Sequence, residues 1–340
     1  MTIKEIALRA NVSIGTVDRV LNNRGRVSKK TEENIRKIIK EIGYTPNIFG
    51  RRLSISKTYI FSVLIPKLHQ DSQYWEMSAK GIDKAVSELK PYKINVNYLF
   101  YDKYSEQSQR KVLEKFMKSE MDGALIAPAN TAQIKTFFSK LPKEIPYVLF
   151  NANIPDTDPV SFIGQDSFQS GVLAAKLMNL LIKNEGNSIA IIKVTNDCHI
   201  NERAEGFTSY YKGNKNYKIN LYTLDCCEKE NFIDLIKKII KVNPGLNGIF
   251  IPNSATHFGA EFVKTEGNKK IHIVGYDLVK ENIDLLNEGY IDFLISQKAD
   301  VQGYEGIYAL YKHIVLGENI SKRIMMPIDI ITKENLLYYR

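Results

Sequence analysis

Residues 12–22, VSIGTVDRVLN, directly follow another short segment, TIKEIALRA at residues 2–10. Apolar side chains recur at helical spacing in both segments, at Ile3, Ile6, Ala7, Ala10, Val17, Val20 and Leu21. Helices shorter than about 12–15 residues are marginal in water on their own, so this pair needs a partner. Residues 28–43, SKKTEENIRKIIKEIG, offer a third helix with isoleucines on one face and Gly43 at its end. The pattern predicts a helix-turn-helix.

Positive charge is concentrated in the same part of the chain. Residues 1–57 hold 13 Lys and Arg against 5 Asp and Glu, whereas the other 283 residues hold 34 against 33. A basic segment on a nearly neutral body indicates an anionic partner, either nucleic acid or an acidic membrane. Because the basic segment is a helix-turn-helix, we expect double-stranded DNA. The simpler alternative is a three-helix bundle whose basic face is only solvated.

The second helix of the motif is the expected recognition element. Ser13 can cap it, and its exposed face carries Ile14, Gly15, Thr16, Asp18 and Arg19. Hydroxyl groups at a helix start suit contacts with phosphate, and an arginine can pair with a guanine edge.

This head resembles the headpiece of the lactose-repressor (LacI-type) family of bacterial transcription regulators. The shared features are a capped VS start, TV-RVLN in the second helix, VS--T---I opening the third, and GY-PN after it. The resemblance implies contacts with operator DNA, made by a homodimer, from these residues: Thr2, Ser13, Ile14, Gly15, Thr16, Asp18, Arg19, Asn22, Asn47, Arg51 and Leu53. Asp18 departs from the family's usual serine. A carboxylate there would repel phosphate or accept a hydrogen bond from a cytosine amino group.

Residues 46–57, PNIFGRRLSISK, form a predicted linker between a head at residues 1–45 and a body at residues 58–340. Members of the family fold this segment into a hinge helix on DNA, and a leucine from each subunit enters the minor groove. The matching residue is Leu53, and apolar wedges flanked by arginines kink DNA in this way. Gly50 lowers helix propensity by about 1 kcal/mol relative to Ala. The alternative is a flexible tether.

The body alternates apolar strands with helical runs. The expected strands are YIFSVLIP, INVNYLFY, GALIAPA, PYVLFN, SFIGQD, IAIIKV, INLYTLD, GIFIPN, IHIVGYD and FLISQ, and the helical runs include residues 76–89, 105–118, 167–184, 230–243 and 300–316. Near-continuous apolar strands separated by helices predict parallel sheets covered on both faces. Ten strands exceed one comfortable sheet, so we predict an α/β body with two lobes.

Polar side chains end many of these strands. They are Asn130, Asn151, Asp166, Asn253, Asp277 and Gln297. Ligands of open α/β sheets bind beyond the carboxyl ends of the strands, so a ligand site is expected there. For single positions such as Asn151 or Asn130, a simple turn-forming role is an equally good interpretation.

The body resembles the effector domain of the same family, which is itself similar to two-lobed periplasmic sugar-binding proteins. The matching motifs place Asp277 in GYD, Arg203 in ERAEGF, Asp166 in GQDSFQSG and Gln297 at a strand end, and DSQYWEM offers Tyr74 and Trp75 as the stacking aromatic. Carboxylates, amides, an arginine and an aromatic ring suit a sugar or polyol. A nucleobase is the second choice.

Motifs of catalysis are missing from the sequence: it has no G-x-G-x-x-G after the first strand, no P-loop, no H-E-x-x-H and no G-x-S-x-G. We therefore expect no enzyme, no catalytic residue, no metal and no cofactor.

The three cysteines, of which two are adjacent, favour reduced thiols in a cytoplasmic protein. No apolar run is long enough to span a membrane. We predict a ligand-controlled, DNA-binding transcription regulator. The alternative is a solute-binding or sensory protein without a DNA role.

Overall fold

A computed structural model describes residues 3–21, 27–42, 57–129, 132–182, 187–195, 197–225, 228–267 and 271–339. The chain divides into two compact units, Met1–Lys57 and Thr58–Arg340. Each unit is described by itself below. Residues 46–56 of the predicted hinge at residues 46–57, including Leu53, lie outside the described residues, as does the helix-ending Gly43.

The first unit is a three-helix head. Its helices are α1 (Ile3–Ala10), α2 (Ile14–Leu21) and α3 (Lys29–Glu41). A small core of Ile6, Ala7, Ala10, Val17, Val20 and Ile35 joins them. The hydroxyl of Ser28, the predicted first residue of the third helix, caps α3 by accepting from the backbone N–H of Thr31 at 3.2 Å. Three short helices thus stabilise one another through apolar faces that none could bury alone.

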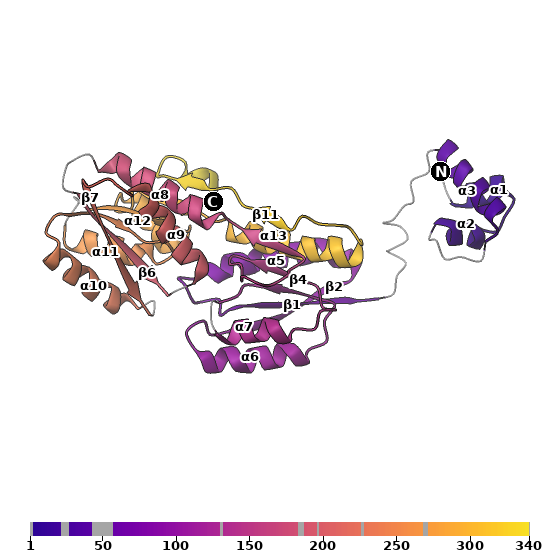
Figure 1. The fold of residues 1–340 in the computed structure, drawn as a ribbon, viewed down its shortest axis with the longest axis horizontal. Coiled ribbons are helices and arrows are strands. Elements are labelled where there is room, and N and C mark those ends of the chain that lie inside the picture. The colour runs from indigo at the N-terminus through magenta and orange to yellow at the C-terminus, as the bar shows by residue number, and fades with distance from the viewer. Residues whose placement is uncertain are drawn as a thin grey trace. The chain divides into compact units, whose positions relative to one another are not determined.

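The second unit has two lobes, each built on a six-stranded sheet (Figure 1). In the first, the N lobe, the strand order is β11-β5-β4-β3-β1-β2. Its strands are β1 (Tyr59–Pro66), β2 (Ile94–Tyr101), β3 (Gly123–Ile126), β4 (Tyr147–Phe150), β5 (Ser161–Gly164) and β11 (Arg323–Met325). Its helices are α5 (Tyr74–Leu89), α6 (Glu106–Lys118), α7 (Ala132–Lys140) and α13 (Ala299–Leu310). Helices α5 and α13 cover one face of the sheet, and α6 and α7 cover the other.

The second lobe, the C lobe, has the strand order β12-β10-β9-β8-β6-β7. Its strands are β6 (Asn187–Val194), β7 (Tyr217–Leu224), β8 (Leu246–Phe250), β9 (His272–Tyr276), β10 (Phe293–Ser296) and β12 (Asp329–Ile331). Helices α8 (Ser167–Leu181) and α9 (Cys198–Tyr210) cover one face, and α10 (Lys229–Val242), α11 (Thr256–Thr265) and α12 (Lys280–Asn287) cover the other.

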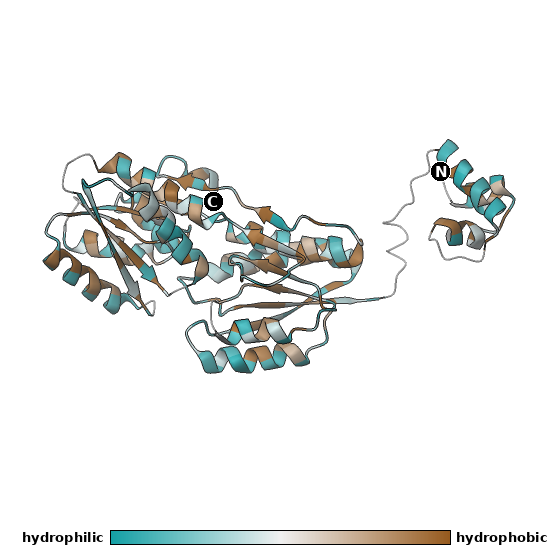
Figure 2. Cartoon of the chain, in the orientation of Figure 1, coloured by the Kyte–Doolittle hydropathy of each residue, from teal (hydrophilic) through white to brown (hydrophobic). Residues whose placement is uncertain are grey.

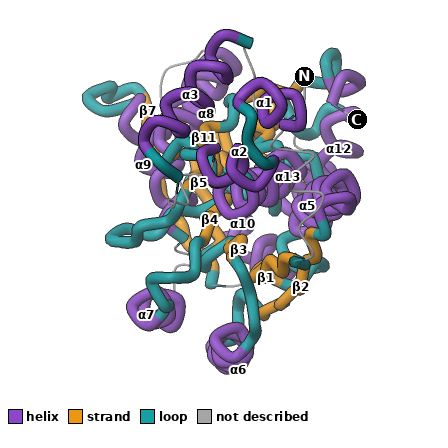
Figure 3. The backbone as a smooth tube through the Cα atoms, turned by 90° about the vertical axis from the view of Figure 1, so that its right-hand side faces the viewer, coloured by secondary structure: helices purple, strands orange, loops and turns teal. Residues whose placement is uncertain are grey.

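The chain crosses between the lobes three times: after β5, after β10, and between β11 and β12. All ten predicted strands are present, and the predicted helical runs correspond to α5, α6, α8, α10 and α13. Two further strands, β11 and β12, were not predicted from the sequence. Each has three residues, and β11 pairs parallel to β5 whereas β12 pairs antiparallel to β10. In Figure 3, strands β5, β4, β3, β1 and β2 of the N lobe follow one another in a row, with α6 and α7 on one side and α5 and α13 on the other.

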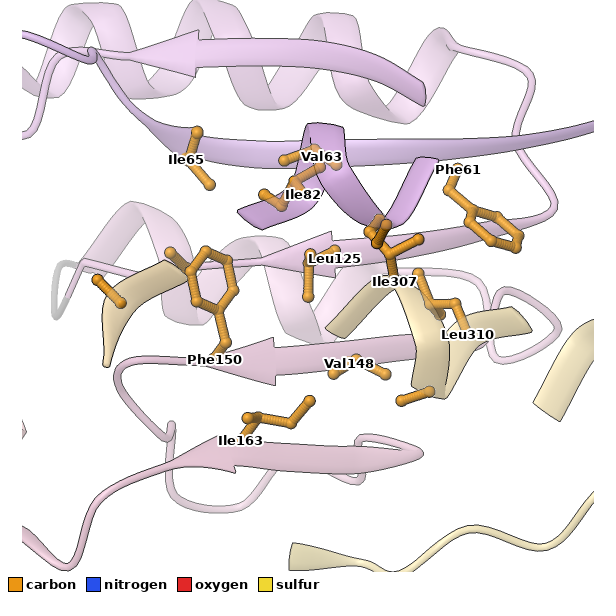
Figure 4. Packing of buried hydrophobic residues seen from close by; sticks show 14 of the residues in the cluster. Phe61, Val63, Ile65, Ile82, Leu125, Val148, Phe150, Ile163, Ile307 and Leu310 are labelled. Carbon is orange, nitrogen blue, oxygen red and sulfur yellow. The ribbon is translucent and has the colours of Figure 1, made fainter. Parts of the chain in front are cut away.

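Buried strands explain the near-continuous apolar runs of the sequence. In β1, alternate residues Phe61, Val63 and Ile65 pack under α5 and α13, as Figure 4 shows, while Leu64 faces α6 and α7. Both faces of the strand are therefore apolar. The helices instead carry an apolar stripe on one side and polar residues on the other (Figure 2). No helix among the described residues is long and apolar enough to cross a membrane.

Candidate functional site

Unusual backbone conformations mark the strand ends that border the space between the lobes. Asn151, Thr195 and Asp277 follow β4, β6 and β9, and their φ angles are +66°, +66° and +72°. Asparagine and aspartate tolerate this left-handed region, but a β-branched threonine does not adopt it readily. Each such residue costs about 1–3 kcal/mol, and strain of this kind collects at functional sites.

A buried hydrogen-bonded chain joins three of the predicted ligand residues. The guanidinium of Arg203, on α9, donates to the side-chain oxygen of Gln297 and, at 2.9 Å, to the carbonyl of Pro252. The amide of Gln297 in turn donates to both carboxylate oxygens of Asp277, at 2.8 and 3.0 Å. The guanidinium also lies over the ring of Tyr276, 4.1 Å from its centre. The arginine is only 1% exposed, and these contacts pair its two terminal nitrogens, while its Nε has no hydrogen-bond partner among the described residues.

Burial dominates the ionisation of this cluster. It raises the pKa of Asp277 to about 7, although the nearby Arg203 and the hydrogen bonds from Gln297 act in the opposite direction. Burial and the positive charge of Arg203 lower the pKa of His199 to about 3, so this imidazole stays neutral. Burial also raises the pKa of Tyr74 well above its ordinary value, and the charge of Asp277 adds to this. The cluster therefore offers a neutral phenol near a carboxyl whose pKa is close to 7, and His199 adds a neutral imidazole near Arg203.

A second chain of hydrogen bonds connects the N lobe to this cluster. The hydroxyl of Tyr74, at the start of α5, donates to the side-chain oxygen of Asn151 at 3.0 Å. The backbone N–H of Asn151 donates to the side chain of Gln302 at 2.9 Å, and the amide of Gln302 donates to the carbonyl of Gln297 at 2.8 Å. Tyr74, Asn151, Gln297 and Asp277 thus belong to one continuous network that spans both lobes.

Trp75 lies beside Tyr74 but makes different contacts. Its ring meets the ring of Tyr74 edge-on, with centroids 5.0 Å apart, and packs against Phe150 in the same manner. Its indole N–H donates to the carboxylate of Asp71 at 3.0 Å. Both aromatic residues belong to the core of the N lobe, and the phenol of Tyr74 lies near enough to Asp277 and Arg203 for their charges to act on its pKa.

Two other predicted residues have local roles in the structure. Asp166 is exposed and caps α8 by accepting from the N–H of Gln169 at 2.9 Å. The side chain of Asn253 accepts from the N–H of Ala255 at 3.3 Å and so stabilises the local turn. Neither joins the buried network through a hydrogen bond between described residues. Asn130 lies outside the described residues.

A pocket of about 260 Å³ lies next to the network. Residues of both lobes line it, among them Asn151, Gln165, Asp166, His199 and Glu202. The side-chain oxygen of Gln165 and Nδ1 of His199 are buried without a hydrogen-bond partner in the part of the chain that the structure describes. Buried polar atoms normally have partners, so these two suit contacts with a polar ligand.

Sequence reasoning missed several residues of this region: Asp71, Lys103, Asp197, His199 and Gln302. A signal for two of them was present, because Lys103 and Asp197 lie in the loops that directly follow β2 and β6. Applying the strand-end rule to every strand would have found them. Gln302 lies within α13, where no local pattern distinguishes it.

The part of the head that was predicted to contact DNA is exposed at Ser13, Ile14, Gly15 and Arg19. Ser13 accepts from the N–H of Thr16 at 3.2 Å and so caps α2, and the two hydroxyls lie 2.9 Å apart. Ile14 is 48% exposed, and a side chain on Gly15 would meet little, its nearest neighbour being the Ser13 hydroxyl at 3.7 Å. Arg19 is exposed on the same helix. Thr2, Asn22, Asn47, Arg51, Leu53 and the side chain of Asp18 lie outside what the structure describes.

Comparisons with known proteins agree with this division of the chain. Residues 2–47 match the family described as bacterial regulatory proteins, lacI family, and residues 62–319 match the family described as periplasmic binding protein domain. The ribose operon repressor of Lactococcus lactis is 25% identical over 98% of each chain. The NTD biosynthesis operon regulator NtdR of Bacillus subtilis is 34% identical over 51% of this chain and half of its own length.

Solved structures with the same fold include both regulators and binding proteins. A structure from Bacteroides fragilis described as a LacI transcriptional regulator has a TM-score of 0.78 and 28% identity, covering 84% of this chain and all of its own. GanP, a glucose-galactose binding protein from Geobacillus stearothermophilus, has a TM-score of 0.75 at 22% identity over 83% of this chain and 99% of its own, a likeness of fold alone. With a helix-turn-helix head and a two-lobed periplasmic-binding-protein-like body, the chain belongs to the lacI family of bacterial regulatory proteins.

Proposed function

We propose that this regulator binds operator DNA as a homodimer through its head and that a small polar ligand, a sugar or polyol, binds between the lobes and changes that affinity. The observation that carries the ligand half of the proposal is the buried network of Arg203, Gln297 and Asp277, which is connected to Tyr74 in the opposite lobe. A ligand that binds one arrangement of the lobes more tightly shifts the equilibrium between arrangements toward that one. We propose that the two arrangements differ in operator affinity, so the ligand changes DNA binding.

The chemistry of the network supports a sugar-class effector. A sugar hydroxyl both donates and accepts, so it pairs with a carboxylate on one side and a guanidinium or amide on the other. The tyrosine supplies an aromatic surface for the C–H groups of the ring. Two relatives are named as the ribose and sucrose operon repressors, which supports the same class. A nucleobase is the alternative effector, since carboxylate, amide and arginine also match its edge.

The competing function is that of a solute-binding or sensory protein without a DNA role. The lacI-family match at residues 2–47 and the exposed face of α2 favour DNA binding instead. We assign no catalytic role, because the relatives are regulators and Asp277 is engaged by Gln297. A DNA-binding regulator acts in the cytoplasm, where the operator is. We also propose that Leu53 enters the minor groove when two hinges meet on DNA.

A ligand screen followed by a DNA selection tests both halves of the proposal. Sugars, polyols and nucleobases are screened for an increase in melting temperature, since a ligand of the folded state stabilises it. The full chain is then used to select from random duplexes, with and without the hit. We expect a sugar or polyol hit, a near-palindromic site, and an operator affinity that depends on the hit and falls steeply with salt. Selection of no symmetric site would refute the DNA role, and stabilisation only by nucleobases would refute the sugar class.

A further inference from the structure

A buried ion triplet connects the two lobes outside the network described above. The ammonium of Lys103, which follows β2 in the N lobe, lies 3.1 Å from the carboxylate of Asp71 and 2.9 Å from that of Asp197. Asp197 belongs to the C lobe, where it immediately precedes α9. The three side chains are 9%, 10% and 8% exposed. Nearly all of this charge is therefore removed from water when the lobes meet.

Neutral hydrogen-bond donors also contact both carboxylates of the triplet. Asp71 accepts from the hydroxyl of Tyr104 at 2.7 Å and from the indole N–H of Trp75 at 3.0 Å. Asp197 accepts from the hydroxyl of Thr195 at 3.1 Å. Paired and hydrogen-bonded charges are tolerated in a low-dielectric interior, whereas removal of one partner leaves the others uncompensated. The closed arrangement of the lobes thus depends on the complete set.

The turn that carries Asp71 has an unusual backbone. Asp71, Ser72 and Gln73 have φ angles of +52°, +58° and +64°, three successive left-handed residues that are not glycine. The C lobe holds this turn in place. The hydroxyl of Ser254 donates to the backbone carbonyl of Asp71 at 2.8 Å, and Ser72 lies within hydrogen-bond distance of the ring of His257.

We propose that Asp71, Lys103 and Asp197 form a latch between the lobes, and that its closure holds the strained turn that positions Tyr74 and Trp75. Helix α5 begins at Tyr74, directly after the turn, so a change in the turn moves both aromatic residues. When the lobes separate, the turn loses Ser254 together with the attraction between Lys103 and Asp197. It then relaxes toward ordinary backbone angles. Lobe closure and the shape of the ligand site are coupled in this way.

Hydrogen exchange and tryptophan fluorescence of the full chain, measured without added ligand, test the latch. Lys103→Met leaves two carboxylates uncompensated at the interface, so we expect at least threefold faster amide exchange in segments 70–76 and 252–258. Trp75 is the single tryptophan of the chain, and it donates to Asp71. Its emission should therefore shift to longer wavelength, and acrylamide should quench it at least twofold more effectively.

Lys67→Met is the matched control. Lys67 also forms a 2.9 Å ion pair with an aspartate, Asp102, but both residues belong to the N lobe. We expect unchanged exchange in the two segments. A double-variant cycle sharpens the comparison: Lys103→Met combined with Asp197→Asn should change exchange by less than the sum of the single effects. If Lys103→Met fails to fold, Asp197→Asn decides alone, because it removes one charge and keeps an oxygen that accepts from Thr195.

The proposal is overturned if folded Lys103→Met, or folded Asp197→Asn, keeps the exchange and quenching of the original chain. It is also overturned if Lys103→Met weakens ligand binding without changing either measurement, since Lys103 would then be a ligand contact. The positioning of Tyr74 for an effector rests on the proposed function, but the measurements on the chain without ligand do not. If no effector and no operator were found, the proposed function would fail, but the measurements on the latch would still be valid.

Discussion

The side-chain amide of Gln297 donates to both carboxylate oxygens of Asp277, at 2.8 and 3.0 Å. One amide thereby fixes the orientation of the acid, while Arg203 holds the amide from its other side. Even so, burial outweighs these contacts and keeps the pKa of Asp277 near 7, against an ordinary value of 3.8. This disparity makes the stability of the C lobe depend on pH.

Asp277→Asn should flatten the dependence of stability on pH between about 4 and 7. In that range the folded protein binds more protons at Asp277 than the unfolded chain does, so the contribution of this group is present at low pH and lost as the pH rises. The neutral asparagine avoids the loss, which amounts to at most about 4 kcal/mol. Denaturant unfolding at pH 5 and pH 8 measures the difference. Equal slopes for the variant and the original chain would contradict the buried, partly protonated carboxyl.

Tyr74→Phe should weaken effector binding about five- to tenfold, because it removes the hydroxyl that donates to Asn151 in the network. Tyr211→Phe is the control. Tyr211 directly follows α9, and its buried hydroxyl donates to the carbonyl of Ala175 in α8, within the C lobe. Each variant should lose about 1 kcal/mol of stability. Calorimetric titration with a sugar hit separates them, and equal loss of affinity in both would remove Tyr74 from the site.

Gly206→Ala should destabilise the C lobe by about 1–3 kcal/mol or more and displace Arg203. A Cβ at Gly206 would lie 2.0 Å from the backbone carbonyl oxygen of Phe168, so α8 and α9 could not keep their close approach. Gly259→Ala offers a milder comparison, since its Cβ would meet only the flexible end of Ile251 at 2.7 Å. Thermal unfolding of both variants checks the ranking. A Gly206→Ala chain as stable as Gly259→Ala would refute the argument from backbone contact.

Arg19→Ala should reduce specific operator affinity by about 1–3 kcal/mol, the value of a good arginine–guanine contact. Lys37→Ala removes a positive charge from α3, where the lysine is 77% exposed and pairs only loosely with Glu41 at 3.9 Å. It should leave specificity unchanged. Gel shifts with the selected operator and with unrelated duplex measure both affinities. If the two variants lose specific affinity equally, α2 contributes only general electrostatic attraction.

Local sequence patterns were sufficient for most of the fold. The strands β1 and β2 have the predicted bounds, and Ser13 caps α2 as expected. These features depend on neighbouring residues: apolar periodicity, a hydroxyl at a helix start, a polar residue after a strand. The strand-end rule also led to Asn151, Asp277 and Gln297, because parallel strands bring their carboxyl ends to one edge.

Only the tertiary structure decides which of these polar side chains meet. Asp166 and Asp277 both follow strands, yet one is exposed at a helix cap and the other is buried beneath Gln297. Gln302 lies within α13 and reaches Asn151 across 151 residues of sequence. The three residues of β11 carry no periodicity and become a strand through pairing with β5. Such contacts join segments distant in the chain, and their geometry follows from the packing of whole sheets and helices rather than from any local pattern.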